Sequence, residues 1–225
     1  MMTASADKKR IAILISGRGS NMMSLVEAMA APEFPAEAVV VISNRPEAAG
    51  LAWAENRGIE SLAIDHKSYP SREAFEAKLH EELSRRQIDI VCLAGFMRLL
   101  TAAFVDKWLG RMLNIHPSLL PAFRGLDTHQ QAIDAGVKIA GCTVHLVVPE
   151  MDAGPIIAQA AVAVHENDSA DTLAARILRA EHKIYPHALH LIASGRGQPH
   201  ENKVLIERSV NQGDELFSPP LANPS

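Results

Sequence analysis

The feature that most constrains the fold is an alternation of short, almost entirely apolar runs with segments of helical spacing. One helical segment spans 71–86, where Phe75, Leu79 and Leu83 follow the i, i+4, i+8 pattern and Ser71 suits an N-cap. The apolar runs are near-continuous, as is typical of parallel strands covered on both faces: RIAILIS (10–16), AEAVVVIS (36–43) and DIVCLAG (89–95). This β-α-β-α order predicts an α/β fold with a doubly wound, mostly parallel open sheet and right-handed crossovers.

The second half of the chain has a different pattern. Two β-rich runs, 139–148 and 155–164, are separated only by PEMDAG, a length that suits a loop between antiparallel strands. A long helix is expected over 170–193 after the N-cap candidate Ser169, and VLIERS (204–209) is expected to add a strand. We predict a single domain over residues 1–209 with an antiparallel extension in this half, and a disordered tail over 210–225.

A glycine-containing turn, LISGRGSNMMSL (14–25), joins the first predicted strand to the first predicted helix. It is not a dinucleotide fingerprint, because Met22 stands at the third glycine position and no acidic residue ends the second strand. It is not a Walker A loop either, since no Gly-Lys-Ser/Thr follows. A plain tight turn would also use Gly17 and Gly19, but Ser20 and Asn21 offer donors where the helix dipole is positive, which favours an anion site.

The run RMLNIHPSLLP (111–121) ends in two polar residues on one side of a strand. Because neighbours in a strand alternate faces, Asn114 and His116 point the same way, and Pro117 then ends the pairing. An amide donor beside an imidazole suits acyl-group transfer, and a carboxylate near the imidazole, best supplied by Asp152 of PEMDAG, favours its charged form. Each residue alone also fits a structural histidine at a strand end or an ordinary turn aspartate.

The composition limits the remaining classes of function. The chain has 225 residues, of which 48% are hydrophobic, and a net charge of −4, which suits a globular domain and gives no reason to expect a nucleic-acid partner. We expect no membrane partner, because neither a membrane span nor a secretory signal is visible. Cys92 and Cys142 lie in apolar runs, which indicates buried free thiols and a cytoplasmic location, and no spacing suits a metal site.

Five motifs together carry a family resemblance over about residues 10–208: ISGRGSN, LAGFMRLL, LNIHPSLLP, HLVVPEMDAGPI and AEHKIYP. In these motifs the chain resembles the phosphoribosylglycinamide formyltransferases, the folate-dependent enzymes of purine synthesis. The resemblance implies small-molecule substrates, with 10-formyltetrahydrofolate as co-substrate and no metal. It divides the domain into a ribonucleotide phosphate site within 10–100 and a folate and catalytic half within 96–209. Whether the chain is a monomer or a homodimer stays open.

The resemblance also implies roles for individual residues. Asn114 would bind the formyl oxygen as it becomes an oxyanion, and His116, held protonated by Asp152, would stabilise that charge and act as the acid. Gly19, Ser20 and Asn21 would hold the substrate phosphate, and Glu181 the ribose hydroxyls. The folate would contact Asn114 and the residues Arg72, Met97, Arg98, Leu99, Leu100, Val148, Pro149, Glu150, Met151 and Asp152.

Two positions depart from the expected pattern: Arg18 adds a charge beside the phosphate loop, and Ala122 replaces a frequent lysine. The alternatives are a formyltetrahydrofolate deformylase, which gives the formyl group to water, and a transferase acting on initiator tRNA or an amino sugar. A nucleotide-binding module without catalysis is a further alternative, disfavoured by the polar residues 114, 116 and 152. His129 and Asp127 are expected neighbours of the site without an assigned step.

Overall fold

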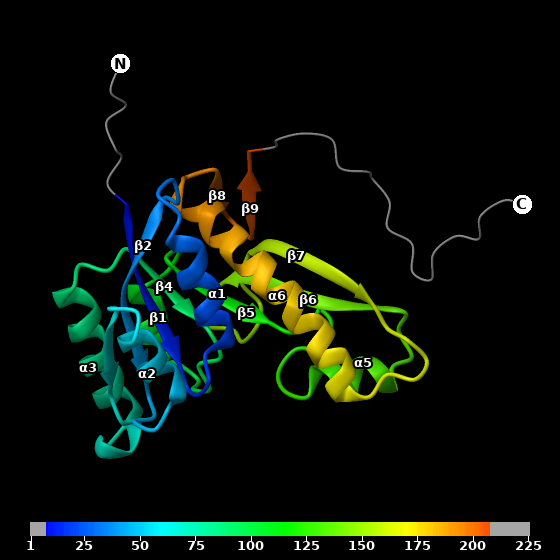
Figure 1. The fold of residues 1–225 in the computed structure, drawn as a ribbon, viewed down its shortest axis with the longest axis horizontal. Coiled ribbons are helices and arrows are strands. Elements are labelled where there is room, and N and C mark those ends of the chain that lie inside the picture. Colours follow the sequence, from blue (N-terminus) through cyan, green and yellow to red (C-terminus); the bar gives the residue numbers. More distant parts are fainter. Residues whose placement is uncertain (1–7, 208–225) are drawn as a thin grey trace, which may run out of the picture.

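The computed structural model describes residues 8–207, and its main element is a seven-stranded sheet in the order β3-β2-β1-β4-β5-β6-β7 (Figure 1). Pairing is parallel from β3 through β5 and antiparallel between β5, β6 and β7. The predicted doubly wound sheet and its antiparallel extension are therefore confirmed.

The helices and strands follow the predicted order closely. The elements are β1 (Lys9–Ile15), α1 (Ser20–Met29), β2 (Ala36–Ser43), α2 (Ala49–Glu55), β3 (Glu60–Ala63), the 3₁₀ turn η1 (His66–Ser68), α3 (Arg72–Arg85), β4 (Ile90–Leu93), α4 (Ala102–Lys107), β5 (Met112–His116), α5 (Thr128–Asp134), β6 (Ile139–Leu146), β7 (Ile156–Ala163), α6 (Ala170–Ala193), β8 (Gly197–His200) and β9 (Lys203–Ile206). The N-cap predictions hold, because the side chains of Ser71 and Ser169 accept hydrogen bonds from Ala74 N and Thr172 N.

Both faces of the sheet are buried, which explains the near-continuous apolar runs. In β1, Ile11, Ile13 and Ile15 pack on the side of α1, α2, α5 and α6, whereas Ala12 and Leu14 pack on the side of α3 and α4. In Figure 1, α1 and α6 lie in front of the sheet, with α3 at the opposite end of the molecule from α5. The hydrophobic core on the α3 side of the sheet includes no residue of β6 or β7. On this side, β5 and β6 are therefore next to loops and not covered by a helix.

The point where the sheet changes winding direction lies between β1 and β4, which are adjacent and parallel. The glycine turn follows β1, and Gly95 to Leu100 follow β4, so both segments start from this one edge. Ligands of doubly wound folds bind at such a switch point.

The C-terminal strand differs from its prediction. β9 covers Lys203–Ile206 and pairs with β8, which the sequence pattern did not reveal, in a separate two-stranded sheet. The predicted tail, 210–225, lies outside the described residues, and the domain boundary stays a prediction. No helix within residues 8–207 has both the length and the hydropathy needed to cross a bilayer.

Candidate active site

The register of β5 and β6 gathers four polar side chains on one face of the sheet. Asn114 lies opposite His145, and His116 lies opposite Thr143. Ile115 and Val144, between them, belong to the apolar core on the α6 side. Since alternate residues share a face, the predicted common direction of Asn114 and His116 is confirmed, and His145 joins them from the neighbouring strand.

His116 is buried and has a partner at each ring nitrogen. Nε2 lies 3.0 Å from the carbonyl oxygen of Phe123, and Nδ1 lies 3.5 Å from Oδ2 of Asp152. Because a carbonyl can only accept, Nε2 carries a hydrogen. The ring is thus held between a carbonyl oxygen that accepts from Nε2–H and a carboxylate on its Nδ1 side.

Asp152 is held in place by close backbone contacts in its loop. The N–H of Gly125 donates to Asp152 Oδ2 at 3.0 Å, and the Asp152 backbone has a left-handed φ of 51°. Two residues later, a Cβ on Gly154 would lie 1.7 Å from the carbonyl oxygen of Leu146, so only glycine fits there. The loop therefore approaches the end of β6 closely enough to bring the carboxylate to His116.

His145, the first residue of the motif HLVVPEMDAGPI, is a site residue to which the sequence analysis gives no role. Its Nδ1 lies 2.9 Å from the carbonyl oxygen of Leu146 and must donate to it. Burial lowers the pKa of His145, so the ring is neutral at pH 7 and Nε2 is an acceptor. The Nδ2 of Asn114 lies 3.3 Å from that nitrogen, and Asp152 Oδ1 lies 3.8 Å from it. His145 thus orients the Asn114 amide by accepting one of its N–H groups. The second N–H of Asn114 takes no part in this contact.

The glycine turn forms the start of α1 and one wall of a pocket. Gly19, with φ 72°, precedes Ser20, and no side chain caps this helix end, so first-turn N–H groups are open to a ligand. The pocket has a volume of about 310 Å³ and is bounded by residues 16–21, by Arg45 and by residues of the segment after β4. The predicted positions Gly19, Ser20 and Asn21 all line it.

A chain of buried polar groups joins this pocket to His116. Asn21 Nδ2 donates to Oε2 of Glu181 at 2.7 Å, which ties α1 to α6. Burial raises the pKa of Glu181, while the Asn21 hydrogen bond and the charge of His116 lower it. Glu181 therefore lies within electrostatic reach of His116, so the pocket at the glycine turn and the polar end of β5 are close to one another.

The segment after β4 presents apolar side chains to solvent next to the pocket. Met97 and Leu99 are 60% and 63% exposed, and Leu100 packs against the α3-side core. The buried Nε of Arg98 has no partner among the described residues. Met97 N donates to Ser16 Oγ at 2.8 Å, which fixes the segment against the end of β1. Exposed large apolar side chains of this kind mark a surface suited to a flat, partly apolar ligand.

The loop over 148–152 is joined to the loop that follows His116. An ion pair of 3.0 Å connects Arg124 to Glu150, and Met151 is half exposed nearby. Arg72, the remaining predicted folate residue, is exposed in the first turn of α3, one turn before Glu76, which binds Thr101. The structure therefore brings the predicted loop residues together but leaves Arg72 at the edge.

Two further observations concern the titratable groups. Residues 8–207 contain no cluster of three or more His, Cys, Asp or Glu side chains that could hold a metal ion. Burial and the nearby charge of His116 lower the pKa of His129, so His129 adjoins the site as a neutral group.

Comparison with known proteins shows the family of the chain. Residues 9–189 match the formyl transferase family model. The chain is 42% identical over 197 residues to phosphoribosylglycinamide formyltransferase of Escherichia coli, covering 88% of this chain and 93% of that protein. It is similar in structure to glycinamide ribonucleotide transformylase 1 from Symbiobacterium toebii, with a TM-score of 0.86 and 47% identity over 88% of this chain and 94% of the other.

A longer relative is also similar. The chain is 52% identical over 195 residues to the trifunctional purine biosynthetic protein adenosine-3 of Bos taurus, covering 87% of this chain but only 19% of that protein. It thus spans about a fifth of the length of that relative. The chain belongs to the formyl transferase family.

Proposed function

We propose that this chain transfers the formyl group of 10-formyltetrahydrofolate to the amine of 5′-phosphoribosylglycinamide. The observation that carries this proposal is the convergence of Asn114, His116 and Asp152 beside a glycine turn that is joined to them through Glu181. Phosphate sites and oxyanion donors have separate uses, but acyl transfer to a sugar phosphate requires both within the length of one substrate. We place this reaction in the cytoplasm, in keeping with two buried free thiols.

In the proposed reaction, the substrate amine attacks the formyl carbon and a tetrahedral intermediate forms. The formyl oxygen becomes an oxyanion, and the free N–H of Asn114 together with His116 Nε2–H stabilises it. The oxyanion must compete with the Phe123 carbonyl, which accepts from the same Nε2–H in the ligand-free protein. Asp152, whose Oδ2 lies 3.5 Å from His116 Nδ1, holds the ring in this orientation.

The intermediate breaks down when the bond between the formyl carbon and folate N10 cleaves. The attacking amine loses one proton and N10 gains one, so the products are the formylated amide and tetrahydrofolate. The proton passes through His116 or through an ordered water. In this proposal the pterin lies against the exposed side chains of Met97 and Leu99.

The test is to mix the purified protein with 10-formyltetrahydrofolate, with and without phosphoribosylglycinamide, and to follow tetrahydrofolate release and acceptor formylation. We expect release only when the ribonucleotide is present, in a one-to-one ratio with the formylated product. Release that ignores the ribonucleotide and yields formate would identify a deformylase instead.

A further inference from the structure

The pocket at the switch point has a charge distribution that the glycine turn alone does not explain. Two arginines line it, Arg18 from the turn itself and Arg45 from the loop after β2, and none of its lining residues is acidic. Asn21, also in the lining and nine-tenths buried, keeps an Oδ1 with no partner within residues 8–207. The pocket lining therefore combines two arginines with an acceptor that has no partner among the described residues. This combination suits a sugar phosphate, which has an anionic phosphate and hydroxyl groups that can donate.

Arg45 is positioned by its backbone. The hydroxyl of the fully buried Ser43 donates to the Arg45 carbonyl at 2.8 Å and accepts from the Arg45 N–H at 3.0 Å. This pair of hydrogen bonds fixes the turn at the carboxyl end of β2. The backbone position of Arg45, from which its side chain extends, is therefore defined.

The loop that carries Arg45 is also tied to the glycine turn. Gly50 N donates to Gly17 O at 3.1 Å, and a Cβ at position 50 would lie 2.4 Å from Ile15 Cδ1. The close approach of these two backbones keeps Arg45 beside the open N–H groups of Ser20 and its neighbours.

Neither arginine is used by the protein itself. Of the arginines in residues 8–207, five form ion pairs with carboxylates, but Arg18 and Arg45 are not among them. Two arginines that line one pocket, without a carboxylate partner among residues 8–207, give it a positive charge that favours an anionic ligand. Such a pair matches a phosphate dianion, which it binds with forked, charge-assisted hydrogen bonds.

We propose that Arg45, together with Arg18, binds the phosphate of the substrate opposite the N–H groups of the glycine turn, and so selects phosphorylated acceptors over their unphosphorylated counterparts. This inference rests on the proposed function for the identity of the acceptor. Arg18 also borders a second hollow of about 460 Å³ between α1 and α6, which Arg45 does not line, so Arg45 gives the cleaner test.

The test compares Arg45→Gln and Arg45→Lys with Arg57→Gln as the matched control. Arg57 follows α2 and stacks on Trp53, with its guanidinium carbon 3.7 Å from the ring centroid. With saturating 10-formyltetrahydrofolate, Arg45→Gln is expected to raise the KM for phosphoribosylglycinamide about tenfold or more, with kcat within about twofold. Arg45→Lys should be intermediate, because a point charge replaces the fork, and Arg57→Gln should match the wild type.

A binding measurement keeps this inference separate from the proposed reaction. Ribose 5-phosphate and ribose are titrated by calorimetry without folate. A wild-type preference for the phosphate ester that falls about tenfold in Arg45→Gln supports the inference even if no formyl transfer is found. An unchanged preference in Arg45→Gln overturns it, even if the transferase activity is established.

Discussion

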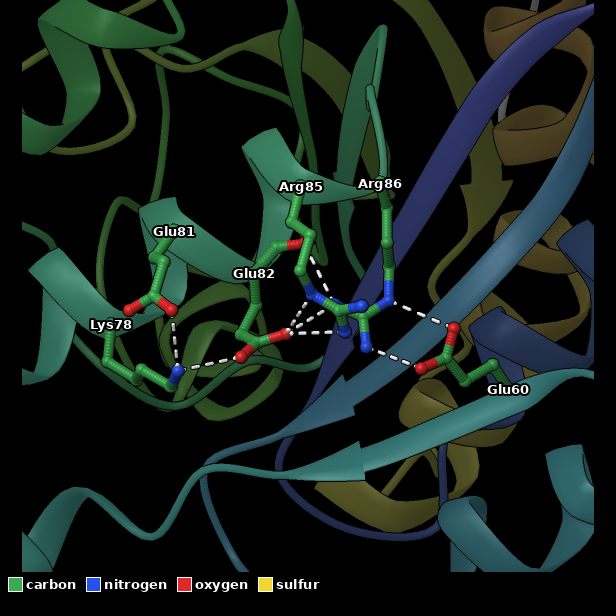
Figure 2. A network of polar contacts seen from close by, with 6 residues as sticks. All are labelled: Glu60, Lys78, Glu81, Glu82, Arg85 and Arg86. Atoms are coloured by element: carbon green, nitrogen blue, oxygen red, sulfur yellow. Dashed lines mark hydrogen bonds and ion pairs between the residues drawn. The ribbon is translucent and has the colours of Figure 1, made fainter.

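The ion-pair network at the C-terminal end of α3 allows a stability prediction whose size follows from the structure. Figure 2 shows Glu82 at its centre, with Lys78, Arg85 and Arg86 around one carboxylate. The distances from the Glu82 oxygens are 2.8 Å to Lys78 Nζ, 3.0 Å to Arg85 Nη2 and 2.5 Å to Arg86 Nη1. The Glu82 side chain is only 11% exposed, so its contacts are partly shielded from water.

These contacts lower the pKa of Glu82 from 4.5 to about 2, with the Lys78 hydrogen bond as the largest cause and that of Arg86 next. A shift of this size would correspond to about 3 kcal/mol if fully expressed. The side chains of Lys78 and Arg85 are 36% and 62% exposed, and solvent screens their share, so we expect Glu82→Gln to lose about 2 kcal/mol at pH 7. Arg86 keeps its second partner, Glu60, and is not left as an unpaired buried charge.

The sign of the pH dependence follows from the lowered pKa. The contribution of Glu82 is fully present above the unfolded-state pKa of 4.5 and is lost as the pH falls toward about 2. The difference between wild type and Glu82→Gln should therefore be constant from pH 7 to 5 and shrink between pH 4.5 and 3. Urea unfolding followed by circular dichroism at each pH measures it.

Glu81→Gln is the matched control for this measurement. Glu81 is the neighbouring residue on the same helix and contacts Lys78 Nζ at 2.9 Å, but it is 62% exposed. Its loss should cost less than about 0.5 kcal/mol. Equal losses in the two variants, or a Glu82→Gln difference that stays the same from pH 7 to 3, would refute the reasoning.

Three further predictions concern the site. His116→Ala should lower kcat at least about a hundredfold with little change in melting temperature, and steady-state kinetics with near-normal turnover would contradict its role. His145→Leu should lower kcat about tenfold because the Asn114 amide loses its acceptor; His145→Gln, which offers an oxygen, should recover part of this, whereas equal rates in both variants would argue against an orienting role. Gly154→Ala should destabilise the protein in urea far more than Gly136→Ala, because a Cβ at 154 meets the Leu146 carbonyl at 1.7 Å, whereas Gly136 has open space and only a strained φ of 65°, worth about 1 kcal/mol. Similar losses at the two glycines would show that the loop at 154 moves freely.

The strand order of the first half could be predicted because each strand is buried on both faces. In the run 10–16, for example, residues 11–15 are all apolar and pack into the two cores on either face of the sheet. Burial, length and the following helix therefore all indicate a strand. The hairpin of β8 and β9 lacks this signal. Three of the four residues from Gly197 to His200 are exposed, and one of these three is a proline. An edge strand paired with a single partner needs no apolar pattern.

The surroundings of Arg45 are a part of the site that could not be predicted from the sequence. The sequence indicates that β2 ends without an acidic residue, which excludes one class of cofactor, but it does not indicate what the arginine faces. Its place depends on the hydrogen bond between Gly50, in the first turn of α2, and Gly17, in the turn after β1. Contacts of this kind follow from the parallel pairing of β1 and β2 and leave no periodic pattern in the sequence.

The role of His145 could not be predicted for a related physical reason. This residue adds a second imidazole to the proposed catalytic residues Asn114, His116 and Asp152. Within one strand, alternation is enough to place Asn114 beside His116, because the two residues are fixed by the same backbone. The position of His145 depends instead on the register between β5 and β6, since a shift by one residue would turn it to the apolar face. That register is fixed by Thr143, whose hydroxyl binds the backbone at Ser118 and Leu120 in the loop after His116. The loop that begins after the predicted histidine therefore also fixes the register that brings His145 to Asn114, so the amide, both imidazoles and the carboxylate depend on one another for their geometry.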